Sequence, residues 1–230
     1  MIGIIGAMGI EIKALADMLE NRKSEIFSGI EYLSGTIHGK KAVLAVCGIG
    51  KVFAAVCAQT MILKFSPDVI INTGVAGTLT DRLSIGDIAV SENVVQHDMD
   101  TTALGDPAGL ISGINVIKIP ADKETCSRLE KCIKQQGINY RVGTIASGDQ
   151  FLASQTVKDK IVKTFGAIAG EMEGGAIGHV CFINGVKFCV LRAISDRADG
   201  SGAENYFEFL EQAAQNAVKV MDSFIKNFGE

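Results

Sequence analysis

The stretch Lys187-Phe188-Cys189-Val190-Leu191-Arg192-Ala193-Ile194 is apolar apart from its first residue and Arg192, and Ser195-Asp196 follow it directly. It does not alternate between apolar and polar residues, as a strand with one solvated face does. A continuous apolar run of this length predicts a strand covered on both faces, with polar side chains at its carboxyl end.

Similar runs recur along the chain, at residues 2–5, 42–46, 69–72, 87–90 and 142–146. Between them lie segments with helical spacing of apolar residues, at 11–20, 52–65, 123–136, 157–165, 173–184 and 204–227. This alternation predicts an α/β fold with a mixed, largely parallel central sheet between two helical layers. With 230 residues, the chain is expected to form one domain, residues 1–230.

Composition excludes several classes of partner. The net charge is −4 and no run of five like charges occurs, which argues against binding to nucleic acid or to an acidic membrane surface. No apolar stretch approaches the roughly 18 residues that cross a bilayer, and the apolar start of the chain has no basic leader. We therefore expect a soluble cytoplasmic protein.

The six cysteines are widely spaced, with no Cys-x-x-Cys pair and no histidine at ligand spacing. They are Cys47, Cys57, Cys126, Cys132, Cys181 and Cys189. We predict that they are reduced and mostly buried, where they act as small apolar residues.

Four short motifs resemble known sites but fail on their spacing. Residues 47–52 lack the first glycine and the final hydroxyl of a phosphate-binding loop, and residues 3–9 read G-x-x-G-x-x-G rather than G-x-G-x-x-G. His97-Asp98-Met99-Asp100 has no second cluster to complete a metal site, and residues 146–149 do not form a serine nucleophile elbow. No metal or cofactor is predicted.

Acidic residues stand where predicted strands end. Glu11 follows the first strand by one helical turn, Glu171 and Glu173 follow an apolar run, and Asp196 ends the last strand on the same face as Arg192. A poorly solvated carboxyl has a raised pKa and can act as a general acid, while an ionised partner activates water. Such a pair suits cleavage of a glycosidic bond.

The same acidic residues also have plain structural interpretations. Glu11 favours a helix N-terminus, Glu173 can cap a helix, and Asp196 can begin a turn. Sequence spacing does not show that they converge. The residues by themselves therefore predict an α/β enzyme with a candidate carboxylate pair, and no more.

Short runs in register along the whole chain resemble the 5′-methylthioadenosine/S-adenosylhomocysteine nucleosidase family, a branch of the purine nucleoside phosphorylase superfamily. The runs are residues 2–8 with Glu11; 48–52; 70–74 with Ala76 and Gly77; 86–88; 97–98 with Asp100; 147–149 with Phe151; 171–173 with Ala176 and Ile177; and 192–196. The resemblance implies the nucleoside phosphorylase fold and a homodimer. It also implies hydrolysis of 5′-methylthioadenosine and S-adenosylhomocysteine, with 5′-deoxyadenosine as a further substrate, to adenine and a 5-thioribose product in methionine salvage.

The resemblance also assigns roles to residues. Asp196 is expected to protonate N7 of adenine, with Ser195 orienting it, while Glu11 takes a proton from water held by Arg192. Glu173 is expected to bind the ribose hydroxyls. The other expected contacts with the small 5′-thioadenosine nucleoside are Met172 on the sugar, Phe151 and the Leu152 backbone on adenine, Met8, Ile49 and Tyr206 around the 5′ group, and Ala76, Gly77 and Glu171 elsewhere in the pocket.

Several positions depart from the family pattern. Val75 replaces a serine, Gly9-Ile10 precede Glu11 where acidic residues are frequent, and Gly174-Gly175 replace Ala-Thr. The segment of residues 101–113 is shorter and more polar than the family pattern leads us to expect, and in the family this region reaches the neighbouring subunit's pocket. Residues 52–65 are apolar nearly all round, which predicts a helix either buried in the core or packed at a subunit interface.

Three other functions stay open. A phosphorylase of the same fold needs cationic and hydroxyl donors for phosphate, but residues 74–77 carry none and no arginine lies in the first turn after Gly6. The sequence does not distinguish a nucleosidase for 5′-methylthioadenosine from one for another 5′-modified adenosine, such as 6-amino-6-deoxyfutalosine. A non-catalytic nucleoside-binding protein could dispense with Glu11 and Asp196, and their joint presence argues against it.

Overall fold

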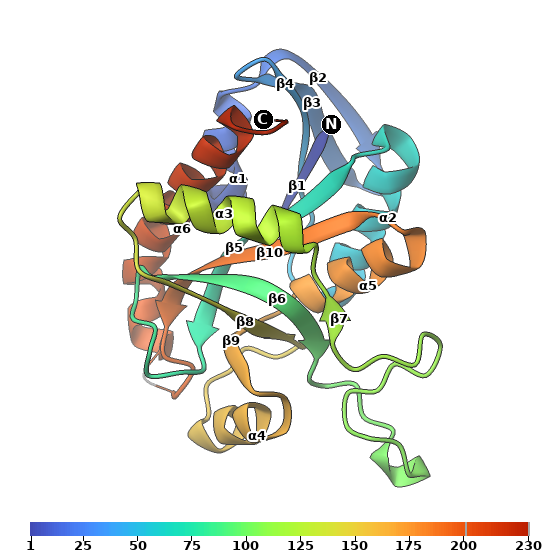
Figure 1. Ribbon diagram of the computed structural model, residues 1–230, viewed down its shortest axis with the longest axis vertical. Helices are drawn as coiled ribbons and strands as arrows, with labels where there is room; N and C mark the ends of the chain where they lie inside the picture. The colour runs from blue at the N-terminus through green and yellow to red at the C-terminus, as the bar shows by residue number, and fades with distance from the viewer. Residues whose placement is uncertain (201, 230) are drawn as a thin grey trace.

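The computed structural model describes residues 1–200 and 202–229, with the backbone alone for residues 202–208. A mixed sheet forms the centre of the molecule, between two groups of helices (Figure 1). Its strands are β1 Ile2–Gly6, β2 Glu20–Phe27, β3 Ile30–Ile37, β4 Lys40–Val46, β5 Val69–Thr78, β6 Ile88–Gln96, β7 Ile119–Pro120, β8 Tyr140–Ser147, β9 Ala167–Glu171 and β10 Lys187–Asp196. The α/β class and the mixed sheet predicted from the sequence are confirmed.

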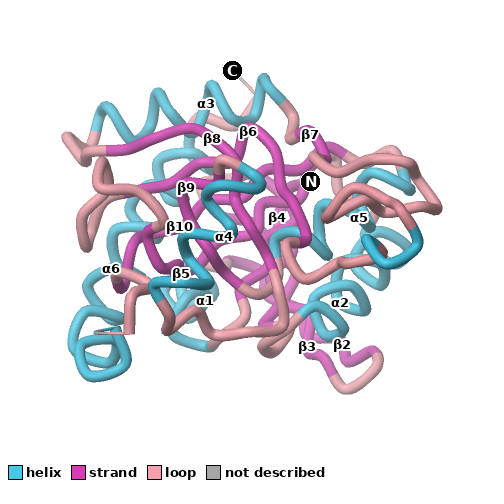
Figure 2. The backbone as a smooth tube through the Cα atoms, turned by 90° about the horizontal axis from the view of Figure 1, so that it is seen from below, coloured by secondary structure: helices cyan, strands magenta, loops and turns pink. Residues whose placement is uncertain are grey.

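The helices are α1 Gly9–Asp17, α2 Lys51–Phe65, α3 Lys123–Gln135, α4 Gln155–Phe165, α5 Gly174–Asn184 and α6 Gly202–Lys226, with a short 3-10 helix η1 at Thr102–Leu104. Helices α1, α3 and α6 pack together on one side of the sheet, and α2 packs with α5 on the other (Figures 1 and 2). Helix α4 lies against β8 and β9. None of the helices in the described part of the chain combines the length and apolar character needed to span a bilayer.

The strand order is β10-β6-β8-β9-β5-β1-β4-β3-β2, and β10 also pairs with β5. Strands β5, β9, β8, β6 and β10 therefore close into a ring, with β1, β4, β3 and β2 extending from β5. Parallel pairings join β4 to β1, β1 to β5 and β5 to β10, so the carboxyl ends of these strands meet at one edge. Residues that follow them are thereby brought together.

Strands β5 and β10 lie at the heart of the core, because every residue of β5 and all but the first of β10 are buried. Arg192 is the largest fully buried side chain, at 1% exposed. The six cysteines are free and buried, as the sequence predicts. Helix α2 is not fully buried: Val52, Phe53 and Leu63 are exposed, so the core-helix interpretation of residues 52–65 is wrong for a single chain.

Candidate active site

A cavity of about 380 Å³ opens at the carboxyl ends of β1, β5, β9 and β10. Of the residues predicted for the site, it brings together Met8, Glu11, Ile49, Ala76, Gly77, Phe151, Glu171, Met172, Glu173, Ser195 and Asp196. It adds Ala7, Val75 and Gly170, which were not predicted.

Two predicted residues, Arg192 and Leu152, are not among those that line the cavity, and a third, Tyr206, cannot be placed against it. Arg192 lies buried among the acidic side chains that do. The Leu152 side chain is buried in a small apolar cluster with Leu79 and Ala198. Tyr206 falls in α6 at a position whose side chain is outside the described residues.

Glu11 is held by backbone donors at the start of α1. Its Oε2 accepts hydrogen bonds from the N–H groups of Ala7 at 2.7 Å and Met8 at 2.9 Å, and its Oε1 accepts from Val75 at 3.1 Å. Burial raises the pKa of the Glu11 carboxyl, and the charge of Arg192 opposes that rise. A carboxylate with a raised pKa is a stronger base near neutral pH than an exposed one.

Arg192 is a buried cation surrounded by acceptors. Its Nη2 pairs with Glu171, lies 3.5 Å from Glu173 Oε2, and donates to the Asn72 side chain, whose own amide donates to the Ile5 carbonyl at 3.0 Å. Its Nε has no acceptor in the described part of the chain. Removing one partner of a buried ion pair costs about 3–5 kcal/mol, so the guanidinium and its carboxylates form a mutually dependent set.

Glu171 and Glu173 have different surroundings although one residue separates them. Glu171 accepts from Ser147 Oγ and from the N–H groups of Glu173 at 3.0 Å and Gly174 at 2.7 Å. Glu173 accepts from the Gly50 N–H at 2.9 Å, and burial raises its pKa to about 7. Glu171 is thus saturated by the protein, whereas Glu173 keeps acceptor capacity for a ligand in the cavity.

Asp196 is fixed at an irregularity in the pairing of β10 with β5. The register shifts between Ile194 and Asp196, which leaves Asp196 opposite Gly77. Its Oδ2 accepts from Ser195 Oγ at 2.9 Å and its Oδ1 from the Ala198 N–H at 2.8 Å. A Cβ on Gly77 would stand 2.7 Å from Oδ1, so only glycine leaves room for the carboxyl group.

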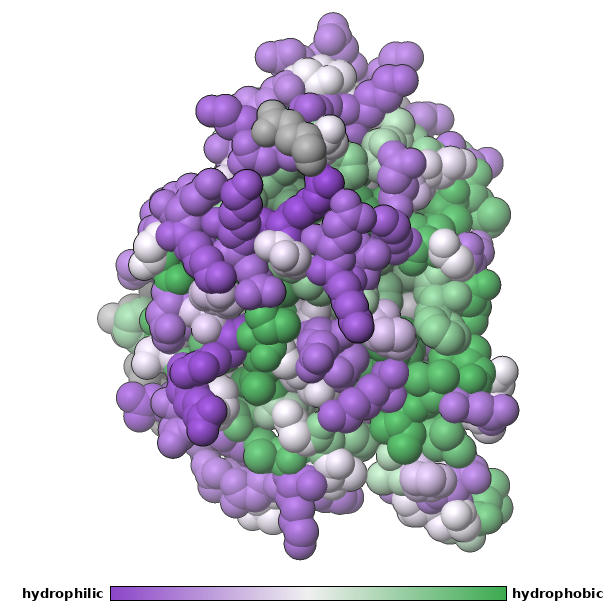
Figure 3. All heavy atoms as spheres, in the orientation of Figure 1, coloured by the Kyte–Doolittle hydropathy of each residue, from purple (hydrophilic) through white to green (hydrophobic). Residues whose placement is uncertain are grey.

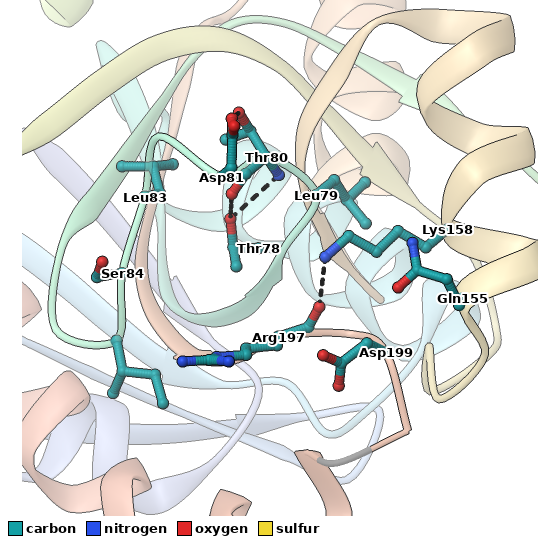
Figure 4. Close-up of a pocket in the computed structure, with 11 residues that line it drawn as sticks. Thr78, Leu79, Thr80, Asp81, Leu83, Ser84, Gln155, Lys158, Arg197 and Asp199 are labelled. Carbon is teal, nitrogen blue, oxygen red and sulfur yellow. Dashed lines mark hydrogen bonds between the residues drawn. The ribbon is translucent and has the colours of Figure 1, made fainter.

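A larger cavity of about 680 Å³ lies beside the residues that follow Asp196. It is lined in part by Thr78, Leu79, Lys158 and Arg197 (Figure 4). Lys158 reaches from α4 and donates to the Arg197 carbonyl at 2.6 Å, which anchors the residue directly after Asp196. The acidic residues of the smaller cavity do not line this one. Chemistry is therefore assigned to the smaller cavity.

Sequence reasoning missed the groups that support these carboxylates. Asn72, Ser147 and Gly50 each lie in a run quoted for the family resemblance, yet residue type gave them no chemical signal. Several donors are backbone N–H groups, which leave no mark in a sequence. In the described part of the chain, no group of three histidine, cysteine or acidic residues is arranged to hold a metal ion.

Comparison with known proteins gives the family. The family model of the Phosphorylase superfamily matches residues 1–228. A 5′-methylthioadenosine/S-adenosylhomocysteine nucleosidase of Staphylococcus haemolyticus is 39% identical over 227 residues, which cover 98% of this chain and 99% of the relative. The chain belongs to the 5′-methylthioadenosine/S-adenosylhomocysteine nucleosidase family.

Solved structures agree with this family assignment. The nucleosidase of that name from Neisseria meningitidis, in complex with methylthio-immucillin-A, superposes with a TM-score of 0.95 at 35% identity, over 99% of each chain. A futalosine hydrolase of Helicobacter pylori gives a TM-score of 0.94 at 36% identity, over 99% of this chain and 97% of that one. The nucleosidase family thus shares the whole fold described above.

Proposed function

We propose that the protein hydrolyses the N-glycosidic bond of 5′-methylthioadenosine and S-adenosylhomocysteine, releasing adenine and the 5-thioribose product. The observation that carries the proposal is the placement of Glu11, Glu173, Phe151 and Asp196 around one cavity. Curated relatives of 38–39% identity bear the name of this activity. We extend the proposal to 5′-deoxyadenosine, which lacks only the thio substituent.

In the proposed mechanism, Asp196 protonates N7 of adenine while Ser195 holds the carboxyl group in place. Glu11 accepts a proton from the attacking water, and Arg192 helps to hold that water. The buried surroundings of Glu11 support its role as base, because they raise its pKa. The acid thus acts on the leaving adenine and the base on the attacking water, as in other glycoside hydrolyses.

Substrate contacts follow from the remaining lining. Glu173 accepts hydrogen bonds from the ribose 2′ and 3′ hydroxyls, Met172 packs on the sugar, and Phe151 stacks on adenine beside the Leu152 backbone. Met8, Ile49 and Tyr206 surround the 5′ group. The half-exposed Phe151 and the exposed Ile49 support these roles, because each leaves apolar surface available to a ligand.

Phosphorolysis is a weaker candidate. A phosphate dianion requires several free cationic or hydroxyl donors. Val75 supplies no hydroxyl to the cavity, and the Arg192 Nη2 is already engaged by Glu171 and Asn72. Cleavage of 6-amino-6-deoxyfutalosine is a second candidate, favoured by the likeness to the futalosine hydrolase fold.

We also propose that the protein is a homodimer built on α2 and α5. Val52, Val56 and Leu63 on α2 and Phe182 and Ile183 on α5 are exposed apolar residues. Figure 3 shows apolar side chains gathered on the side of the molecule where Figure 1 places these two helices. A stripe of this kind on a single chain marks a protein interface.

Residues 101–113 project from the body of the molecule near this surface (Figure 1). At their tip, in η1, Leu104 is 84% exposed. We propose that this segment reaches the cavity of the partner subunit and contacts the 5′ group there. We also propose that the enzyme is cytoplasmic and acts in methionine salvage on a small nucleoside. The net charge of −4 argues against nucleic acid or an acidic membrane surface as its partner.

The deciding experiment measures adenine release from 5′-methylthioadenosine by the purified protein, with and without phosphate, and identifies the sugar product. Free 5-methylthioribose without phosphate is the expected result. Release only with phosphate, as the sugar 1-phosphate, establishes a phosphorylase instead. Release from 6-amino-6-deoxyfutalosine alone establishes the second candidate.

A further inference from the structure

Three motifs that serve no role in the mechanism meet beside the active site. They are the glycine-rich turn that precedes α2, the His97-Asp98 pair after β6, and the Ser147-Gly148-Asp149 run at the end of β8. Lys51, Asp98 and Asp149 come from these three segments and bond to one another. We call them the Lys51–Asp98–Asp149 cluster.

The cluster is a closed ring of hydrogen bonds. Lys51 Nζ donates to Asp98 Oδ1 at 2.7 Å, and the other Asp98 oxygen accepts from the Asp149 N–H at 2.9 Å. Asp149 Oδ1 in turn accepts from the Lys51 N–H at 2.7 Å. Each residue therefore holds the other two, and no bond can lengthen without moving a second segment.

The ring is shielded more than an ordinary surface ion pair. The side chains of Lys51 and Asp98 are each only 19% exposed. Burial alone would raise the pKa of Asp98, but the Lys51 ammonium and the Asp149 N–H outweigh it and hold the pKa below its ordinary value. The Asp149 carboxylate also stands at the N-terminus of α2, where the helix dipole favours negative charge.

Two residues of the ring, Lys51 and Asp149, are close in the chain to residues that contact the proposed substrate or its binding groups. Gly50, one residue before Lys51, donates its N–H to Glu173 Oε1 at 2.9 Å. Its φ of 99° and the Asp149 Oδ1 only 3.0 Å from where a Cβ would stand both require glycine there. Phe151 lies two residues after Asp149 and lines the cavity.

We propose that the Lys51–Asp98–Asp149 cluster positions Glu173 and Phe151 for ribose and adenine, and so sets the affinity for the nucleoside without taking part in bond cleavage. This inference rests on the proposed function of those two residues. The acid and the base are fixed elsewhere: Asp196 by Ser195 and Ala198, and Glu11 by Ala7, Met8 and Val75. Disruption of the cluster should therefore leave them in place.

The test compares Lys51→Met and Asp98→Asn with the wild type. Because the lost contacts bind the ground state and the transition state alike, KM should rise about tenfold while kcat stays within about threefold. Lys51→Arg keeps the charge and should restore most of the affinity. The double variant should be no worse than the more impaired single variant, since the ring acts as a unit.

Lys13→Met is the matched control, because Lys13 pairs with Asp17 at 2.8 Å, close to the 2.7 Å between Lys51 and Asp98, but does so on an exposed helix face. It should leave both constants unchanged. Equal KM values for the wild type and the cluster variants would overturn the inference. A fall in kcat with KM unchanged would also overturn it, because that result indicates loss of folded enzyme rather than weaker binding of the nucleoside. A wild type that cleaves none of the nucleosides tested would instead remove the proposed function on which the inference rests.

Discussion

Glu11 and Arg192 meet over Gly74, whose missing side chain makes room for both. A Cβ at this position would stand 2.5 Å from Glu11 Oε1 and in still closer collision with Arg192 Nη1. The glycine in the middle of β5 therefore lets a buried acid and a buried cation approach each other beside the cavity. The hydrolysis proposed above uses these two groups together, one as the base and the other to hold the water.

Gly74→Ala should lower kcat/KM about 100-fold, because a methyl group would have to displace the base and the arginine, and a misplacement of about 1 Å can cost that much in rate. Steady-state kinetics measure the loss. Gly9→Ala is the control: a Cβ there meets nothing within 4 Å, although Gly9 is close to Met8 in the chain. Wild-type kinetics in the Gly74 variant would show that the site tolerates the shift.

Much of the fold could be predicted because buried strands and amphipathic helices leave clear patterns. Strand β10 is apolar nearly throughout and is buried as expected. Strand β2, with the sequence ENRKSEIF, escaped prediction because it is an exposed edge strand with many charged residues. The closure of β5, β9, β8, β6 and β10 into a ring was also not predicted, since pairing depends on register and not on composition.

Part of the candidate site could likewise be predicted from the sequence, and part could not. Glu11, Glu173 and Asp196 could be named from their positions after strands, and the structure places all three on one cavity. Their convergence could not be derived, because spacing in sequence says nothing of distance across a sheet. The backbone donors from Ala7, Val75 and Gly50 were invisible for a simpler reason: every residue except proline carries an N–H.

Stability should depend on pH through Glu173. Burial raises the pKa of this carboxyl from 4.5 to about 7, so the folded state holds its proton at pH values where the unfolded chain has lost it. The contribution of the Glu173 carboxyl to the free energy of unfolding is then complete below pH 4.5 and is lost as the pH rises through about 7. The free energy of unfolding should therefore fall across this range.

Glu173→Gln removes the titrating group and should flatten that pH dependence in thermal unfolding between pH 5 and about 8. It should also raise KM, because the amide is a poorer acceptor for ribose hydroxyls. Glu92→Gln, at an exposed carboxyl outside the site, is the control and should keep the wild-type slope. An unchanged slope in the Glu173 variant would assign the pH dependence to other groups.

The proposed dimer can be tested on the exposed stripe of α2. Leu63 is 69% exposed in the single chain, and a charge at its position would be buried without a partner in the dimer. Leu63→Glu should shift the protein to monomer in sedimentation velocity and lower activity, because residues 101–113 would no longer reach a partner's cavity. Ile26→Glu, on β2 and 70% exposed, should remain dimeric.

Asp196→Asn tests the general acid with the least change of shape. Asparagine can still accept from the Ala198 N–H and contact Ser195, so the nucleoside should bind with nearly unchanged affinity, measured by calorimetry. It cannot give a proton to N7, and kcat should fall by about 100-fold or more. Asp81→Asn, at an exposed carboxyl of the neighbouring cavity, should retain full activity. An Asp196 variant with more than about a tenth of the wild-type rate would exceed what loss of a general acid leaves, and would move the proton donor to another group.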